Sequence, residues 1–195
     1  MRRKAEIERK TQETAVRVSI DLDGNGEVDV KTGIPFFDHM LTLVAVHGFL
    51  DLSIHAQGDI EVDSHHTVED VGIVLGDVVD KALGDRKGVR RYGFAVTPMD
   101  DALATVAIDL SRRPYLVFQV PPVDMFERAF NRSLAKEFFK SLVNRSGMNL
   151  HISVPYGENE HHLLEAVFKS FGRALHQAAG IDDRIRDLRS SKGSL

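Results

Sequence analysis

The histidines of this chain occur in a pattern that could hold metal ions. Two copies of a His-His-x-x-Glu motif stand at His65–Glu69 and His161–Glu165, and 161 − 65 = 96 residues separate them. On a helix, residues four apart share one face, so the first histidine and the glutamate of each motif can bind one cation. The middle histidines, His66 and His162, point about 100° away from that face. Each motif is therefore predicted to serve two cations, with both motifs contributing to both sites.

The types of donor narrow the choice of metal. The chain has no cysteine, which excludes thiolate metal sites, cysteine nucleophiles and disulfides. Imidazole and carboxylate donors suit Mn, Fe, Co, Ni or Zn better than Mg or Ca. The alternative is two solvated helix starts that match by chance, but repetition of the whole motif favours metal binding.

One further donor is expected from the helix that precedes each motif. His39 lies in FFDHML, and its counterpart, 137 − 39 = 98 residues on, is Glu137 in AKEFF. Both side chains are competent metal ligands. For His39, packing within the helical layer is the alternative.

Composition places the chain among ordinary globular proteins. It has 195 residues, 43% apolar and 28% charged, with a formal net charge of −4. That charge supplies no basic field for nucleic acid. The N-terminus lacks the apolar core of a signal peptide, and no apolar run approaches the roughly 20 residues of a membrane span. The cytoplasm is the expected location, and neither nucleic acid nor a membrane is an expected partner.

Alternation and turn signals predict strands between the helices. Residues 14–22 and 27–32 are expected to pair as a β-hairpin, with Asn25 and Gly26 in the turn. Asp63 or Ser64 is expected to cap the first motif's helix, and Asn159 the second. The other predicted helices and strands are helices 36–48, 65–83, 132–147 and 161–180, and strands 51–58, 94–99, 102–110, 115–120 and 149–157.

The order of helix, strand, loop and motif helix occurs twice, which indicates an internal duplication. We expect an α+β protein made of duplicated βαβ-like halves, with sheets packed with helices. The first half would span residues 1–93 and the second 94–181, followed by a polar tail, 182–195. Halves of about 95 residues have thin cores, so they must pack together.

Basic residues could hold an anionic ligand, although each one alone is more typical of a solvated charge. The sequence SSKG, 190–193, is more suggestive, because hydroxyls, backbone amides and a lysine suit phosphate. The candidates are Arg90, Arg91, Arg112, Arg113, Lys169 and Lys192.

At this point the sequence resembles a known family. The segments GIPFFDHML (33–41), DSHHTVEDVG (63–72), PMDDAL (98–103), GENEHHLLEAVFKSFGRAL (157–175) and RSSKG (189–193) are similar to imidazoleglycerol-phosphate dehydratase of histidine biosynthesis. The resemblance implies a lyase that removes water from D-erythro-imidazole-glycerol-phosphate, giving imidazole-acetol-phosphate. It also implies two Mn²⁺ ions per site, a ribosomal protein S5 domain 2-like fold, and a 24-subunit shell with active sites between subunits.

The resemblance also implies roles for single residues. Glu165 is expected to abstract the proton while touching metal, and Glu13 to act at the substrate as a second catalytic carboxylate. Some family members have a histidine at the position that Glu137 takes in this chain, so Glu137 is a candidate substitute for that ligand. The metal ligands would be His39, His65, His66, Glu69, His161, His162 and Glu165, and the substrate contacts Glu13, Arg91, Asp100, Arg113, Lys169, Ser191 and Lys192.

The seven ligands divide into two predicted groups. Helix geometry groups His65 with Glu69 and His162. It groups the second motif's His161 and Glu165 with His66 and His39.

Two other functions would use a similar set of ligands. A dinuclear metallohydrolase would activate a metal-bound hydroxide and release phosphate from a phosphomonoester. A non-catalytic metal-binding shell would leave no coordination position open. It would have no need of Glu13 or of the SSKG tail.

Overall fold

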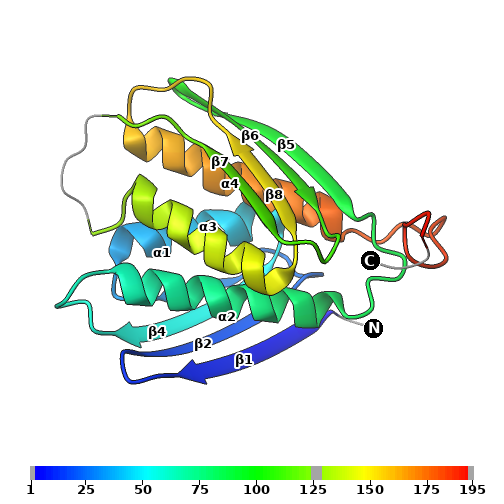
Figure 1. The fold of residues 1–195 in the computed structure, drawn as a ribbon, viewed down its shortest axis with the longest axis horizontal. Helices are drawn as coiled ribbons and strands as arrows, with labels where there is room; N and C mark the ends of the chain where they lie inside the picture. The colour runs from blue at the N-terminus through cyan, green and yellow to red at the C-terminus, as the bar shows by residue number, and fades with distance from the viewer. Residues whose placement is uncertain (1–2, 124–128, 193–195) are drawn as a thin grey trace.

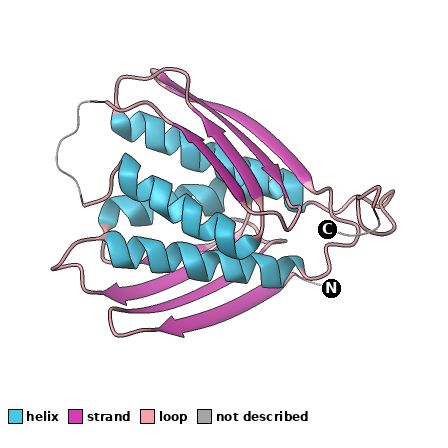
Figure 2. Ribbon diagram, viewed as in Figure 1, coloured by secondary structure: helices cyan, strands magenta, loops and turns pink. Residues whose placement is uncertain are grey.

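The chain folds into three layers, with helices between two sheets (Figure 1). The structure is a computed structural model that describes residues 3–123 and 129–192. Within these residues, two four-stranded sheets enclose four helices (Figure 2). None of these helices is both long enough and apolar enough to cross a membrane. The predicted α+β class, with sheets packed with helices, is confirmed.

Both halves have the same order of elements, which confirms the duplicated βαβ-like architecture. The first half contains β1 (Lys4–Lys10), β2 (Thr14–Asp21), β3 (Val28–Lys31), α1 (Pro35–Gly48), β4 (Asp51–Gly58) and α2 (His65–Leu83). The second contains β5 (Tyr92–Met99), β6 (Ala102–Asp109), β7 (Tyr115–Gln119), α3 (Arg132–Ser146), β8 (Asn149–Ser153) and α4 (Glu160–Ala179). The strand orders are β1-β2-β4-β3 and β5-β6-β8-β7. In each half a helix connects two parallel neighbours, β3 with β4 and β7 with β8.

The hairpin predicted across Asn25 and Gly26 is wrong. Strand β2 pairs antiparallel with β1 and β4, whereas β3 pairs parallel with β4. The segment between β2 and β3 passes over the start of β4, where Asp51 Oδ1 accepts the backbone N–H groups of Asn25 at 2.7 Å and Glu27 at 3.2 Å. Strand β1 was not predicted, because its sequence KAEIERK is mostly charged.

Glycines let the helices of the middle layer approach one another closely. A Cβ added at Gly76 of α2 would lie 2.6 Å from the carbonyl oxygen of Leu142 on α3. A Cβ at Gly172 of α4 would lie 2.5 Å from the carbonyl oxygen of Val44 on α1. Each helix pair therefore packs backbone against backbone at these points, which fixes the relative positions of the side chains near the helix starts.

The helix contact at Gly76 can be tested by adding a single methyl group. Gly76→Ala would force the new Cβ against the backbone of α3, and a backbone atom cannot move aside as a flexible side chain can. We expect a loss of about 1–3 kcal/mol in the free energy of unfolding, measured by denaturant titration. Lys136→Ala, at an exposed position of α3, is the control and should change stability by less than about 0.5 kcal/mol. An unchanged stability of Gly76→Ala would contradict the close approach.

Candidate metal centre

Both His-His-x-x-Glu motifs lie in the first turns of long helices, at the same end of the helical layer (Figure 1). Asn159 is the N-cap of α4, and its side chain accepts the backbone N–H of His161 at 3.0 Å, as predicted. At the start of α2, Asp63 Oδ1 accepts the backbone N–H of His65 at 2.7 Å. Ser64 is the N-cap residue there, but its side chain makes no capping bond.

The second motif forms a compact cluster with His39. Glu165 Oε1 lies 2.8 Å from His161 Nε2 and 2.9 Å from His39 Nε2. His39 comes from α1, which packs against α4. Across residues 3–123 and 129–192, this is the one group of three His or acidic side chains whose ligand atoms all lie within 4.8 Å of one another. The structure thus brings together three of the four ligands predicted for one site.

Glu165 is held as a carboxylate inside this cluster. Its side chain is only 7% exposed, and this burial raises its pKa. Hydrogen bonds from Lys169, His39 and His161 oppose burial and lower the pKa of Glu165 to about 2. Lys169 donates to Oε2, so both carboxylate oxygens are engaged. Two imidazole nitrogens and an ionised carboxylate fit Mn²⁺ or another first-row transition ion.

The first motif is more open. His65 Nε2 lies 3.8 Å from Glu69 Oε2, and the two side chains are 44% and 43% exposed. Glu137 of α3, the predicted counterpart of His39, forms an ion pair with Lys140 at 3.1 Å. Within the described residues, the first motif therefore presents a His–Glu pair that no donor of the neighbouring helix α3 completes.

The middle histidines lie apart from the groups predicted for them. His66 Nδ1 faces the two carboxylate oxygens of Asp59 at 3.0 and 3.2 Å, and this contact is the main cause of a raised His66 pKa. Glu13 Oε2 lies 3.9 Å from the same nitrogen. His162 Nδ1 contacts Asp101, and its Nε2 lies 3.4 Å from Asp100 Oδ2. Within one chain, His66 does not join His161, and the assignment of both middle histidines as ligands stays a prediction.

Asp101 is fixed more firmly than Asp59. It accepts the backbone N–H groups of Glu158 and of Asn159, the latter at 3.1 Å. The Glu158 amide is the main cause that holds the pKa of Asp101 well below its usual range, and the contact with His162 comes second. Sequence reasoning missed both aspartates. Asp59 stands only 7 residues before His66, and this short spacing is a signal that could have indicated it, whereas Asp101 stands 61 residues before His162.

The residues predicted to bind phosphate fall in two places. Asp109 accepts from Arg91 Nε at 2.6 Å and Nη2 at 3.0 Å, and lies 3.7 Å from Arg113. Arg91 Nη1 also donates to the Arg189 carbonyl at 2.7 Å, which holds the tail beside the start of β5. Lys169 instead lies at the histidine cluster.

Ser191 and Lys192 are exposed at the end of the described tail, and Gly193 of the SSKG motif lies outside the described residues. The phosphate role of this tail stays a prediction.

Comparisons with known proteins identify the family. The family described as imidazoleglycerol-phosphate dehydratase matches residues 32–175. The chain belongs to the imidazoleglycerol-phosphate dehydratase family. It is therefore an enzyme, a hydro-lyase of histidine biosynthesis.

Full-length relatives and solved structures agree with this family. The chain is 60% identical to the imidazoleglycerol-phosphate dehydratase of Desulfosudis oleivorans and 53% identical to that of Geobacter sulfurreducens, with all of both chains covered in each case. The crystal structure of the Staphylococcus aureus dehydratase has a TM-score of 0.82 at 37% identity, covering 92% of this chain and 99% of that one. The Pyrococcus furiosus dehydratase in complex with (S)-C348 has a TM-score of 0.81 at 37% identity, covering 97% and 100%.

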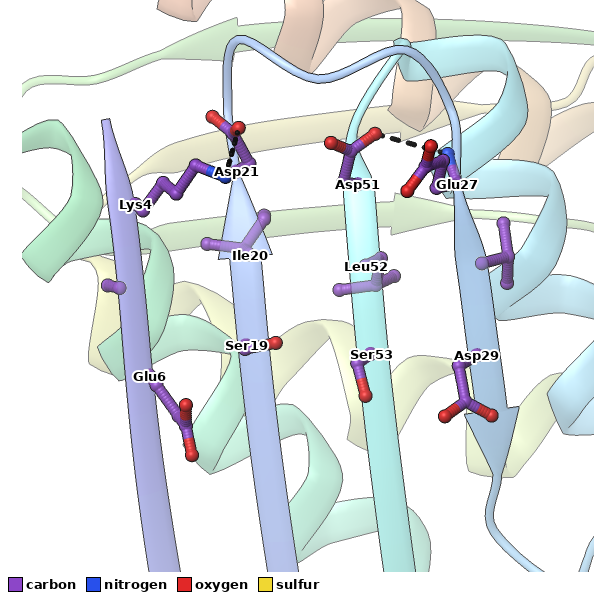
Figure 3. A pocket seen from close by; sticks show the side chains of 12 residues that line it. Lys4, Glu6, Ser19, Ile20, Asp21, Glu27, Asp29, Asp51, Leu52 and Ser53 are labelled. Carbon is purple, nitrogen blue, oxygen red and sulfur yellow. Dashed lines mark hydrogen bonds and ion pairs between the residues drawn. The ribbon is translucent and has the colours of Figure 1, made fainter. Parts of the chain in front are cut away.

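A hollow of about 570 Å³ lies on the first sheet, but it lacks the chemistry of the dehydratase site (Figure 3). Its lining comes from β1 to β4 and includes neither motif. Lys4 is paired with Asp21 at 3.0 Å, and Asp51 is occupied by backbone amides. We therefore place the candidate site at the helix starts and not in this hollow.

The caps at the two motif helices offer a matched pair of substitutions. Asn159→Ala removes the acceptor for the His161 amide, and we expect a loss of about 1 kcal/mol in the free energy of unfolding. Ser64→Ala occupies the equivalent cap position of α2 but removes no capping bond, so its loss should be smaller. Denaturant unfolding of both variants without added metal makes the comparison. Equal losses would contradict the capping role of the Asn159 side chain.

Proposed function

We propose that this chain dehydrates D-erythro-imidazole-glycerol-phosphate to imidazole-acetol-phosphate, using a dinuclear manganese site. The observation that carries the proposal is the cluster of His39, His161 and Glu165 in a member of the dehydratase family. The cytoplasm remains the expected location.

The substrate explains why metal ions are needed. The proton to be removed lies on a carbon beside an imidazole, with no carbonyl to acidify it. Bound metal ions would supply the Lewis acidity that makes this proton easier to remove. The histidine and carboxylate donors at the helix starts are the groups of this chain that would hold them.

Two carboxylates are proposed for proton transfer. Glu165 is ionised and would accept the proton, but its bonds to Lys169 and two histidines make it a weak base in the metal-free chain. Glu13 lies on the turn between β1 and β2, and its side chain is 56% exposed. It is therefore available to a substrate approaching the helix starts.

Arg91 and the histidine cluster lie at opposite ends of strand β5. Arg91 precedes β5 and Asp100, which neighbours His162, follows it. The 100 − 91 = 9 steps along the chain, at roughly 3.3 Å each, span about 30 Å. The three-carbon chain of the substrate is far shorter than this. A site that uses both the arginines and the histidines therefore needs two copies of the chain, which supports an assembly with sites between subunits, proposed here as a 24-mer.

Glu165→Gln tests the proposed chemistry. The substitution keeps the shape of the side chain but removes its negative charge and its basicity. We expect kcat for imidazole-acetol-phosphate formation to fall by about 100-fold or more, with the oligomer retained. Glu8→Gln, at an exposed position of β1, is the control. Near-normal turnover of Glu165→Gln would remove Glu165 from catalysis.

The products that the wild-type protein forms from the substrate distinguish the proposed dehydratase from the two alternative functions. Phosphate release would favour the metallohydrolase. Manganese binding without any turnover would favour the non-catalytic shell.

Metal removal tests the coupling between cation binding and assembly. Where ligands from different subunits meet at one ion, its binding energy contributes to association. We therefore expect complete chelation to break the particle into smaller species, and we expect added Mn²⁺ to restore it. Size-exclusion chromatography with light scattering measures the size of the particle in each state. An unchanged particle after complete removal would contradict this coupling.

A further inference from the structure

The middle histidine of each motif is held through the same ring nitrogen by an aspartate. His66 Nδ1 lies 3.0 and 3.2 Å from the oxygens of Asp59. His162 Nδ1 contacts Asp101. The two motifs thus share an arrangement that their sequences do not reveal, because the two aspartates stand 7 and 61 residues before their histidines.

This contact determines which nitrogen is available to a cation. An ionised carboxylate only accepts hydrogen bonds, so Nδ1 must carry the proton. A neutral imidazole then has its lone pair on Nε2, which becomes the nitrogen able to bind a metal ion. At His162 this nitrogen lies 3.4 Å from Asp100 Oδ2, a longer contact than the one between Nδ1 and Asp101. Carboxylate partners of this kind orient metal-binding histidines and raise their basicity.

The duplication shows that the two aspartates are not equivalent in the fold. Strand β6 begins 102 − 14 = 88 residues after β2, and the residues just before these strands, Asp101 and Glu13, are also 101 − 13 = 88 apart. Glu13 is therefore the counterpart of Asp101. It lies near the equivalent nitrogen, at 3.9 Å from His66 Nδ1, but Asp59 from the β4–α2 loop lies closer.

The carboxylates near the two middle histidines also differ in their other contacts and in their exposure. Asp101 is fixed by the amides of Glu158 and Asn159 in addition to His162. The side chain of Glu13 is 56% exposed, and that of Asp59 is 24% exposed. In the second half the turn residue holds the histidine, whereas in the first half a loop residue has taken over this contact.

We propose that Asp59 and Asp101 are positioning residues that keep Nε2 of His66 and His162 available as metal ligands, and that Asp59 thereby leaves Glu13 to the substrate. The proposal rests on the proposed function for the identity of the cation and of the substrate. It separates two carboxylates near one histidine into a positioning group and a reacting group.

Manganese affinity, measured without substrate, is the direct test. Asp59→Asn and Asp101→Asn can each present an amide N–H to Nδ1, which favours the wrong tautomer. We expect each to weaken Mn²⁺ binding by about 10–100-fold in a competition titration with a chelating dye. Asp29→Asn is the matched control, because Asp29 holds His55 Nε2 at 2.8 Å, and both are absent from the candidate ligand set. Its Mn²⁺ affinity should equal that of the wild type.

Glu13→Gln distinguishes the two roles at His66. We expect it to lower kcat while its Mn²⁺ affinity stays within about threefold of the wild type. For Asp59→Asn we expect the opposite pattern, in which saturating Mn²⁺ recovers most of kcat. Thermal unfolding in chelator should give similar midpoints for the wild type, Glu13→Gln and Asp59→Asn, because the positioning role acts through the metal. Asp101→Asn should unfold at a lower temperature, because it also weakens the bonds to the amides of Glu158 and Asn159.

Three results would overturn the inference. They are unchanged Mn²⁺ affinity in both aspartate variants, an equal loss of affinity in Glu13→Gln, and an equal loss in Asp29→Asn. If the wild type binds Mn²⁺ but does not dehydrate the substrate, the proposed function fails while the affinity comparison still stands.

Discussion

The close approach of paired helices between the sheets is the constraint on which the site depends. Gly172 allows the backbone of α4 to lie against Val44 of α1. His39 lies on α1 less than two turns before Val44, and Glu165 lies on α4 two turns before Gly172. The 2.9 Å contact between His39 and Glu165 is therefore a consequence of helix packing. A wider spacing between these helices would leave Glu165 with donors from its own helix alone.

The duplication gives two similar frameworks, but their chemistry has diverged. The pair α2 and α3 repeats the packing of α4 and α1, with Gly76 against Leu142. At the position where His39 would have a counterpart, Glu137 is paired with Lys140. His65 and Glu69 consequently remain open to a cation or to donors from elsewhere. The second motif and His39 of α1 thus form a nearly complete group of candidate ligands, and the first motif forms an incomplete one.

Local sequence patterns predicted most of the helices and strands. The pairing of the strands depended on residues that are far apart in the sequence. The helices of both motifs follow from apolar periodicity and from caps such as Asn159, which need only neighbouring residues. The pairing of β2 depended on the charged strand β1 and on Asp51, which binds the passing amides of Asn25 and Glu27. Asp101 could not be predicted for the same reason, because the folded chain brings it to His162 across 61 residues. Asp59 stands only 7 residues before His66, and its contact depends on the path of the β4–α2 loop.

The length of strand β5 is the reason why the proposed chemistry calls for assembly. At one end of β5, Asp109 neutralises much of the charge of Arg91, and the Arg91–Arg189 bond holds the tail in place. Because these contacts are already made in the single chain, little entropy remains to be lost in ordering that end when an anion binds. At the other end, the histidines hold their ring nitrogens toward carboxylates before any cation arrives. Each end is ordered by its own contacts, so joining two chains can complete a site without rebuilding either half of it.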